Sequence, residues 1–228
     1  MTTMSQIKGV LFDLDGVITD TARLHAQAWR QIAQQVQTPW TPVLADQLKG
    51  IDRQQSLALI LAAGHHEHEY TDAQKKALAA AKNERYLALV AALTPTDIEP
   101  GIRKFLAELQ QRGYRLALAS SSKNAPVVLQ QLGLADFFQH IIDPAKLEHG
   151  KPAPDIYLQA AAAIDLAPAA CLGIEDAASG VAAINAAGAT AIGIGDSAEL
   201  NEAAVVLPDT AALTLNHLQK ALGGELLD

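Results

Sequence analysis

The sequence of 228 residues is 50% hydrophobic and only 18% charged, which excludes a disordered chain and predicts a compact fold large enough to carry an insertion. Its formal charge of −8 argues against a surface that binds nucleic acid or an anionic membrane, although a small anionic substrate can still bind in a locally basic pocket. One cysteine excludes an internal disulfide, and the N-terminus lacks the apolar core of a signal peptide. We therefore expect a cytoplasmic protein that acts as a monomer, without nucleic-acid or membrane partners.

The first predicted element is a strand that ends in two carboxylates. In the stretch Gly9 to Thr21, GVLFDLDGVITDT, a run of apolar residues stops at Asp13 and Asp15. Such a run is typical of a strand buried on both faces of a parallel sheet, where ligands bind beyond the carboxyl ends of the strands. A turn at Gly16 can then aim one carboxylate forward and the other sideways. A solvated turn explains the pair equally well in isolation, so its interpretation depends on residues further along the chain.

The next region is predicted to be helical throughout. From Thr21, apolar residues recur every three or four positions until Pro39 and Pro42 stop the helix. A second helix follows Asp52, which can cap it, and a third covers residues 72–93. Because no strand is predicted between these helices, we interpret the region as an all-α cap domain inserted into the chain.

The remainder of the chain alternates strands and helices. Residues 94–101 are rich in turn formers and return the chain from the insertion, with Pro100 expected in the first turn of a helix that Gly113 ends. The repeated strand–helix units predict an α/β fold with a doubly wound, mostly parallel, Rossmann-like sheet. The predicted core domain comprises residues 1–19 and 98–228, and the cap domain residues 20–97. The later strands are expected at 115–119, 140–142, 171–174, 190–194 and 204–207, and the helices between them at 125–132, 154–164 and 177–187.

Polar residues follow the ends of several of these strands. In a doubly wound sheet the loops after the strands meet at one edge, so we expect these residues to converge with the two aspartates of the first strand. Taken singly, the serines and the later carboxylates are also typical helix caps. The residues concerned are Ser120, Ser121, Ser122, Lys123, Asn124, Lys151, Glu175 and Asp176.

The convergent carboxylates predict a magnesium site. Several acidic groups in one crevice repel one another unless a cation lies between them, and Mg²⁺ prefers oxygen ligands. The expected ligands of one Mg²⁺ per active site are Asp13, Glu175, Asp176 and the backbone carbonyl of Asp15. The serine cluster at a helix N-terminus is in turn typical of a phosphate site.

An aspartate, a metal ion, a phosphate cradle and a second carboxylate together describe phosphoryl transfer through an aspartyl phosphate. Asp13 is the expected nucleophile. The metal ion and Lys151 offset the negative charges of the carboxylate and the phosphoryl oxygens, which would otherwise keep the two anions apart. Asp15 is the expected general acid and base.

Four motifs resemble those of the haloacid dehalogenase superfamily, and they occur in the same order: DLDGVITDT, the serine after RLALA, the lysine of GKPAPD, and the GIED pair. The predicted insertion looks like the helical cap of that superfamily, and the resemblance covers nearly the whole chain. Through LKGIDRQQSL, ALASSSKNAP and GIEDAASG, the sequence is most similar to the sugar-phosphate mutases of the superfamily. The resemblance implies an isomerase that interconverts β-D-glucose 1-phosphate and D-glucose 6-phosphate, with β-glucose 1,6-bisphosphate as its activating intermediate.

The resemblance also implies roles for the matching residues, beginning with Asp13 as nucleophile and Asp15 as acid and base. The transferring phosphoryl group would be held by Ser120, by Ser121 through its N–H, and by Lys151. The distal phosphate would contact Arg53, Ser122, Lys123 and Asn124. The cap side, near the sugar, would be lined by His25, Lys49, Gly50, Ser56 and Lys82.

Two alternatives remain open at this stage. A sugar-phosphate phosphatase of the same superfamily would use the same core residues, with water in place of the second hydroxyl, and Arg53 and Lys49 would be the discriminating residues. A phosphorylatable receiver module would need neither Asp15 as acid and base nor a lid. Asp52 departs from the pattern, because it stands where a small hydroxyl residue is expected and adds negative charge beside Arg53.

Overall fold

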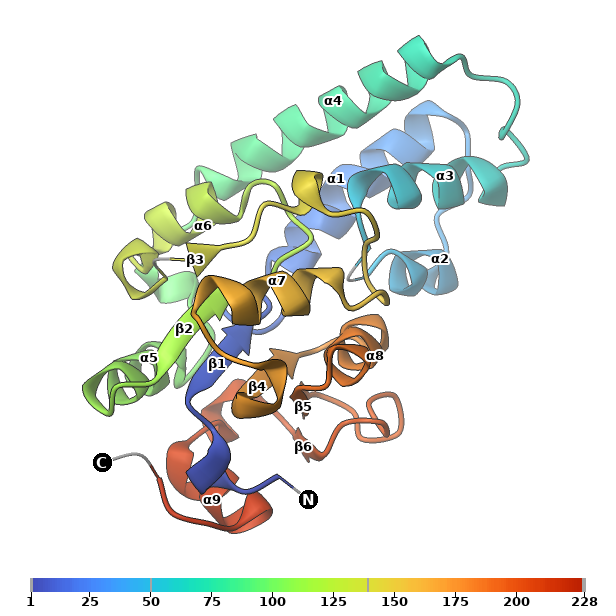
Figure 1. Ribbon diagram of the computed structural model, residues 1–228. Helices are drawn as coiled ribbons and strands as arrows, with labels where there is room; N and C mark the ends of the chain where they lie inside the picture. Colours follow the sequence, from blue (N-terminus) through green and yellow to red (C-terminus); the bar gives the residue numbers. More distant parts are fainter. Residues whose placement is uncertain (1, 50, 139, 227–228) are drawn as a thin grey trace.

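The computed structural model describes residues 2–49, 51–138 and 140–226. Within them, six strands form one parallel sheet in the order β3-β2-β1-β4-β5-β6 (Figure 1). The chain enters at the centre of the sheet, builds one side and then crosses to the other, which confirms the expected doubly wound α/β fold. The strands are β1 (Gly9–Phe12), β2 (Arg115–Leu118), β3 (His140–Ile141), β4 (Cys171–Glu175), β5 (Thr190–Ile194) and β6 (Val205–Leu207).

Helices cover both faces of the sheet. The side chains of β1 point alternately to these two faces, and each face has its own apolar cluster. Val10 and Phe12 pack with residues of α5, α6 and α9, whereas Leu11 packs with residues of α7 and α8. All four residues of β1 are buried, as expected for a central parallel strand. The helices are α1 (Thr21–Gln35), α2 (Pro42–Gln47), α3 (Arg53–Ala63), α4 (Asp72–Val90), α5 (Ile102–Gln111), α6 (Ala125–Leu132), α7 (Asp155–Ala163), α8 (Ala178–Ala187) and α9 (Leu215–Leu222).

The helices α1 to α4 form a bundle that extends beyond the carboxyl ends of the strands (Figure 1). Trp29 and Ile32 of α1 pack with Ile60 and Leu61 of α3 and with Leu78 of α4, in an apolar cluster separate from the two that cover the sheet. The inserted region therefore has a core of its own, and α1 and α4 also contact the core of the sheet domain near their inner ends. The boundaries after residues 19 and 97 stay a prediction.

Several helix boundaries differ from those predicted. Pro42 was expected only to stop the preceding helix, but it is the first residue of α2. Thr41 caps this helix by accepting a hydrogen bond from Leu44 N, and proline is tolerated in a first turn. Pro100 lies before α5 rather than in its first turn, since Gly101, with a φ of 84°, is the N-cap. The helix expected over 72–93 ends at Val90.

The C-terminal helix α9 was absent from the predicted elements. Its apolar residues Leu215 and Leu218 are buried against the sheet domain, and Thr214 caps it by accepting a hydrogen bond from His217 N. In the part of the chain that the structure describes, no helix combines the length and the apolar character needed to cross a membrane.

Candidate active site

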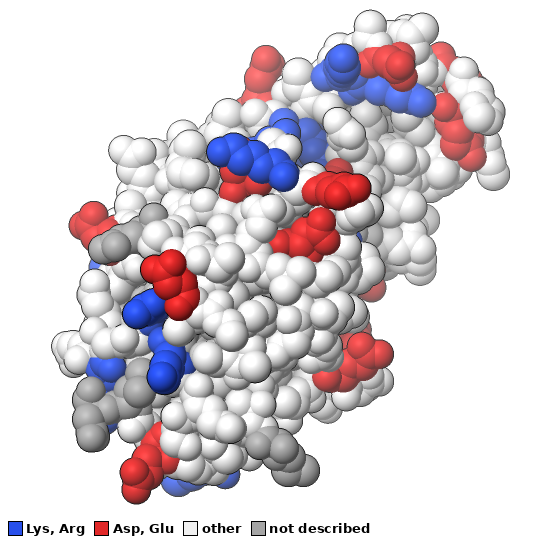
Figure 2. Space-filling view, viewed as in Figure 1, with Lys and Arg blue, Asp and Glu red and all other residues white. Residues whose placement is uncertain are grey.

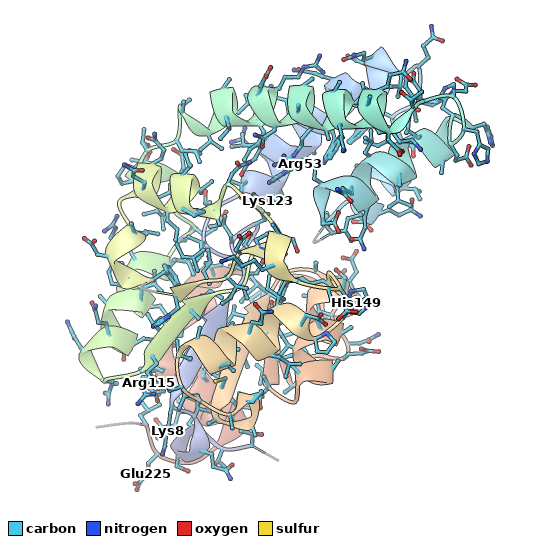
Figure 3. All side chains as sticks on the ribbon, turned by 45° about the horizontal axis from the view of Figure 1, so that its top comes forward. Lys8, Arg53, Arg115, Lys123, His149 and Glu225 are labelled. Atoms are coloured by element: carbon cyan, nitrogen blue, oxygen red, sulfur yellow. The ribbon has the colours of Figure 1, made fainter. Side chains whose placement is uncertain are left out.

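A cavity of about 520 Å³ lies between the carboxyl ends of the strands and the helical bundle. Figure 3 shows that Arg53 from α3 and Lys123 from the loop before α6 come from different parts of the chain, and both side chains line this cavity. On the face shown in Figure 2, acidic and basic side chains are interspersed, and basic ones also gather between the bundle and the sheet. The predicted site residues that line the cavity are Asp13, Asp15, His25, Lys49, Arg53, Ser56, Lys82, Ser121, Ser122, Lys123, Lys151 and Asp176.

Three predicted residues lie outside this lining, and one lies outside the described residues. Glu175 is fully buried and bonded to Lys151, and Ser120 is buried within the loop that follows β2. Asn124 is the N-cap residue of α6, but its side-chain amide bonds to Asn83 of α4. Gly50 belongs to the part of the chain that the structure does not describe.

Lys151 links two buried carboxylates. Its Nζ donates to Asp13 Oδ1 at 2.7 Å and to Glu175 Oε1 at 2.5 Å, and all three residues are at most 4% exposed. Burial lowers the pKa of Lys151, but the charges of the two carboxylates outweigh that effect and hold its pKa well above the ordinary value. Lys151 is therefore a fixed cation at the end of β1, where an incoming phosphoryl group would meet Asp13.

Glu175 is held in place through both of its carboxylate oxygens. Oε1 also accepts from Tyr157 Oη at 3.0 Å, and Oε2 accepts from the backbone N–H groups of Asp176 and Ala177, each at 3.1 Å. A Cβ at Gly180 would lie 1.8 Å from Oε1, so only glycine leaves room for this carboxylate against α8. These bonds and the one from Lys151 occupy the four acceptor sites of the carboxylate, so a metal ion on Glu175 would take the place of one donor.

Asp13, Glu175 and Asp176 offer carboxylate oxygens that all lie within 4.8 Å of one another. Burial raises the pKa of Asp13 to about 7, against the opposing charge of Lys151. Burial, together with the charge of Glu175, raises the pKa of Asp176 to about 8. Three carboxylates thus share the one positive charge of Lys151, and a hard divalent cation with oxygen ligands fits this donor set.

Gly16 makes room for the third of these carboxylates. Its φ is 76°, and a Cβ there would lie 2.0 Å from Asp176 Oδ2. The close approach and the left-handed backbone both require glycine at this turn. The direction of the Asp15 side chain relative to Asp13 stays a prediction, as does a contact of its backbone carbonyl with a metal ion.

Asp15 lies at the junction of the sheet and the bundle. Its Oδ1 accepts a hydrogen bond from Thr21 Oγ1 and lies 3.8 Å from His25 Nε2. Burial raises the pKa of Asp15 above its ordinary value, which favours the protonated form that a general acid needs.

Behind Asp15, His25 connects to the long helix α4. The His25 ring stacks on Tyr86 with centroids 4.0 Å apart, and its Nδ1 lies 2.5 Å from Lys82 Nζ. Burial, with the nearby charge of Arg53, lowers the pKa of Lys82 to about 7. Burial and the neighbouring cations also lower the pKa of His25, so the imidazole is neutral.

The loop after β2 folds back on itself through its serines. Ser120 Oγ accepts from Ser122 N at 3.1 Å, and Ser122 Oγ accepts from Asn124 N at 3.3 Å. These turns bring Ser121, Ser122 and Lys123 to the wall of the cavity, next to the start of α6. Hydroxyl and N–H groups near a helix N-terminus are of the kind that can hydrogen-bond a phosphate group.

On the cap side, several predicted residues bond within the bundle. Lys49 Nζ lies 2.8 Å from Asp46 Oδ1, and Ser56 Oγ donates to the backbone oxygen of Asp52 at 2.8 Å. Asp52 itself caps α3, because its Oδ1 accepts from Gln54 N and Gln55 N at 2.7 and 2.9 Å. The unexpected acidic residue beside Arg53 thus has a structural role in the capping box.

Sequence reasoning missed four residues that shape the site. The signals were weak: Asn83 directly follows the predicted Lys82, Thr21 begins a helix, and Tyr157 lies in an apolar helix. Gly180 belongs to a motif, but only the position of the Glu175 carboxylate reveals that glycine is required there. The missed residues are Thr21, Asn83, Tyr157 and Gly180.

Comparisons with known proteins agree with this geometry. A family model for haloacid dehalogenase-like hydrolases matches residues 7–188. The chain is 46% identical over 214 residues to a β-phosphoglucomutase of Bacillus subtilis, covering 94% of this chain and 95% of that protein. It is 27% identical to a phosphorylated carbohydrates phosphatase of Thermotoga maritima over 95% of this chain and all of that protein. The crystal structure of a β-phosphoglucomutase from Clostridium difficile superposes with a TM-score of 0.92 at 38% identity, covering 95% of this chain and 97% of that one.

Proposed function

The chain belongs to the haloacid dehalogenase-like hydrolase family, and on that premise we propose that it is a phosphomutase that interconverts β-D-glucose 1-phosphate and D-glucose 6-phosphate. The observation that carries this proposal is one cavity with basic side chains on two of its walls. Asp13 and Lys151 form one wall, and Arg53 and Lys123 form the other. A bisphosphate needs two such walls, whereas hydrolysis of a monophosphate needs one. The 46% identity to a β-phosphoglucomutase supports the same assignment.

Asp13 is the nucleophile of the proposed reaction. Its carboxylate oxygen forms a bond to phosphorus while the bond between phosphorus and the sugar oxygen breaks, which leaves an aspartyl phosphate. Lys151, 2.7 Å from Asp13 Oδ1, offsets the charge that accumulates on the phosphoryl oxygens. The loop of Ser120 and Ser121 binds the same group through hydroxyl and N–H donors.

One Mg²⁺ per site would be held by Asp13, Glu175 and Asp176 and by the backbone carbonyl of Asp15. When bound, it supplies charge stabilisation to the transferring phosphoryl group. Glu175 keeps its orientation through four donors, so the ligand set is ordered before metal binds.

Asp15 is the general acid and base. It donates its proton to the departing sugar oxygen, and it takes a proton from the hydroxyl that later attacks the aspartyl phosphate. Thr21 and His25 hold its carboxyl group at the junction of core and cap. The raised pKa of Asp15, caused by burial, suits a group that must carry a proton near neutral pH.

The second wall explains the isomerisation. β-Glucose 1,6-bisphosphate forms as the intermediate, turns around in the cavity, and presents its other phosphate to Asp13. Arg53, Ser122, Lys123 and Asn124 hold the phosphate that is not reacting, while residues 20–97 act as a cap that excludes water. His25, Lys49, Gly50, Ser56 and Lys82 provide the cap side of the sugar site. Both walls come from one chain, so the proposed enzyme acts as a monomer, and a single buried Cys171 suits the reducing cytoplasm.

A sugar-phosphate phosphatase is the second candidate. The 27% identity to a carbohydrate phosphatase over the whole of that protein favours it, because the core residues would keep the same roles. The basic groups of the cap then need another explanation, and the higher identity to a mutase makes this reading the weaker one.

The deciding experiment is a time course with purified protein, Mg²⁺, β-glucose 1-phosphate and a trace of glucose 1,6-bisphosphate. Glucose 6-phosphate and free phosphate are measured in the same samples. Rapid formation of glucose 6-phosphate with little free phosphate is the expected result. Stoichiometric release of phosphate and glucose would replace the mutase with the phosphatase.

A further inference from the structure

Asn83 of α4 joins Arg53, which lines the cavity, to Asn124, which lies beside the cavity at the start of α6. Its Oδ1 accepts a hydrogen bond from Arg53 Nη2 at 2.7 Å and another from Asn124 Nδ2 at 2.8 Å. The first bond lies within the helical bundle, and the second crosses from the bundle to the sheet domain. Arg53 and Asn124 have roles in the proposed function, but Asn83 has none so far.

The two bonds determine how the amide groups are turned. A guanidinium can only donate, so the atom of Asn83 that faces Arg53 must be its oxygen. The same oxygen faces Asn124, which must therefore direct its NH₂ group towards Asn83. Without Asn83, the side-chain amide of Asn124 could equally turn its carbonyl oxygen towards a phosphate. The carbonyl oxygen and the phosphate oxygens are all acceptors, so they would repel each other. Arg53 thus fixes Asn83, and Asn83 fixes Asn124.

Asn83 also orders Arg53 without neutralising it. An arginine side chain loses rotamer entropy when it is held in one conformation, and a bond made before the ligand arrives removes part of that cost from binding. Because the amide oxygen is uncharged, the full positive charge of Arg53 remains available to a phosphate. Lys49 shows the contrast, since its charge is already paired with Asp46.

We propose that Asn83 is a positioning residue for the distal phosphate of the substrate. It pre-orients Arg53 and Asn124 as donors, and it does so only while cap and core are in contact, so that the second wall is complete when the cap is closed. This inference rests on the proposed function for the identity of the ligand, but the bond geometry is independent of it.

The first test measures binding in an Asp13→Asn background with Mg²⁺, where no aspartyl phosphate can form. Glucose 1,6-bisphosphate is titrated calorimetrically into this protein and into the same protein carrying Asn83→Leu, which keeps the size of the side chain and removes the acceptor. The dissociation constant is expected to rise about tenfold, the scale of one hydrogen bond to a charged group. Asn83→Gln keeps an amide oxygen and is expected to retain part of the affinity.

The second test separates positioning from a general loss of structure. In the otherwise unchanged enzyme, Asn83→Leu should raise KM for the bisphosphate and leave kcat and the hydrolysis of p-nitrophenyl phosphate unchanged, because that ester has no distal phosphate. Asn216→Leu, on the exposed side of α9, is the matched control. An unchanged dissociation constant, or equal losses with both substrates, would overturn the inference.

The binding measurement also distinguishes this inference from the proposed function. If the wild-type protein hydrolyses sugar phosphates instead of isomerising them, the proposed function fails, but a weaker bisphosphate complex with Asn83→Leu still supports the positioning role. If the Asp13→Asn protein binds no bisphosphate, both fail.

Discussion

The two walls of the cavity are built in different ways. On the core wall, Asp13 and Lys151 are at most 4% exposed; they are bonded to each other, and Lys151 is also bonded to the buried Glu175, which lies outside the lining. On the cap wall, Arg53 and Lys49 are partly exposed, and each is bonded to a residue of the bundle. Removing Lys151 leaves two buried carboxylates without their cation, whereas removing Arg53 or Lys49 leaves no buried charge unpaired.

This difference indicates a division of labour. Charges that are buried and mutually paired cost several kcal/mol when one partner is lost, so they are retained where the chemistry needs a fixed arrangement. Partly exposed cations contribute little to stability and can be adapted to the substrate. The core wall thus provides the reaction, and the cap wall selects the molecule that undergoes it.

The strongest test of this division is Lys151→Met. The substitution leaves Asp13 and Glu175 buried without their common cation, and it removes the charge that faces the phosphoryl oxygens. We expect a loss of roughly a thousandfold in kcat and of about 3 kcal/mol in the free energy of unfolding. Steady-state kinetics and urea denaturation measure the two effects.

A second substitution separates the two effects of Lys151→Met. Adding Glu175→Gln removes one of the unpaired charges, so it should restore part of the stability and none of the activity. Lys146→Met, at a position exposed to solvent, is the matched control and should change neither quantity. If Lys151→Met unfolds like the wild type, the core wall is not a mutually dependent unit.

On the cap wall, Arg53→Ala is expected to act on selectivity. The turnover of β-glucose 1-phosphate should fall about a hundredfold, because one charge-assisted contact to the distal phosphate and its ordering are lost. Hydrolysis of p-nitrophenyl phosphate and the free energy of unfolding should change little. Arg23→Ala, on the outer side of α1, serves as the control for loss of a positive charge. Equal losses with both substrates would place Arg53 in the reaction itself.

A smaller effect on the core wall is expected from Gly180→Ala. The new Cβ would displace the Glu175 carboxylate, which should weaken Mg²⁺ binding about tenfold and lower stability by about 1–3 kcal/mol. Gly173→Ala offers a comparison, because the three atoms nearest to its Cβ would all belong to the side chain of Ile184. That variant should lose stability and keep its affinity for Mg²⁺, as measured by calorimetric titration. Similar affinities for Mg²⁺ in both variants would argue against Glu175 as a ligand.

The sequence was most informative about the core wall. Its residues follow the ends of apolar strands, and the topology of a doubly wound sheet then brings them together whatever the details of the loops. The strand Thr190–Ile194 and the helix Ala125–Leu132 were predicted with the bounds that the structure has. By contrast, α2 was missed because Pro42 can stop one helix or begin another, and a capping side chain decides between them.

The cap wall was less accessible to sequence reasoning. Arg53 and His25 look like ordinary helix residues, and only the resemblance to a family marked them as site residues. Asn83 carried no signal, because its role depends on a contact with Asn124, which lies 41 positions further along the chain. Contacts between domains depend on how helices pack, and local pattern does not encode them.

The smallest expected effect is a difference in how stability depends on pH between a lysine of the cap wall, Lys82, and a lysine of the core wall, Lys151. The folded-state pKa of Lys82 is lowered from 10.5 to about 7 by burial, so keeping it charged costs stability at pH 7, and that cost declines as the pH rises towards 10.5. Relative to Lys82→Met, the wild type should therefore gain roughly 2 kcal/mol in the free energy of unfolding between pH 7 and pH 9. Lys151, with a raised pKa, stays protonated in both states over this range and contributes no such dependence on pH. Urea denaturation of the wild type and of Lys82→Met at both pH values measures the difference. A constant difference for Lys82→Met would mean that Lys82 keeps its charge as firmly as Lys151 does, and that the two walls do not differ in how they hold their cations.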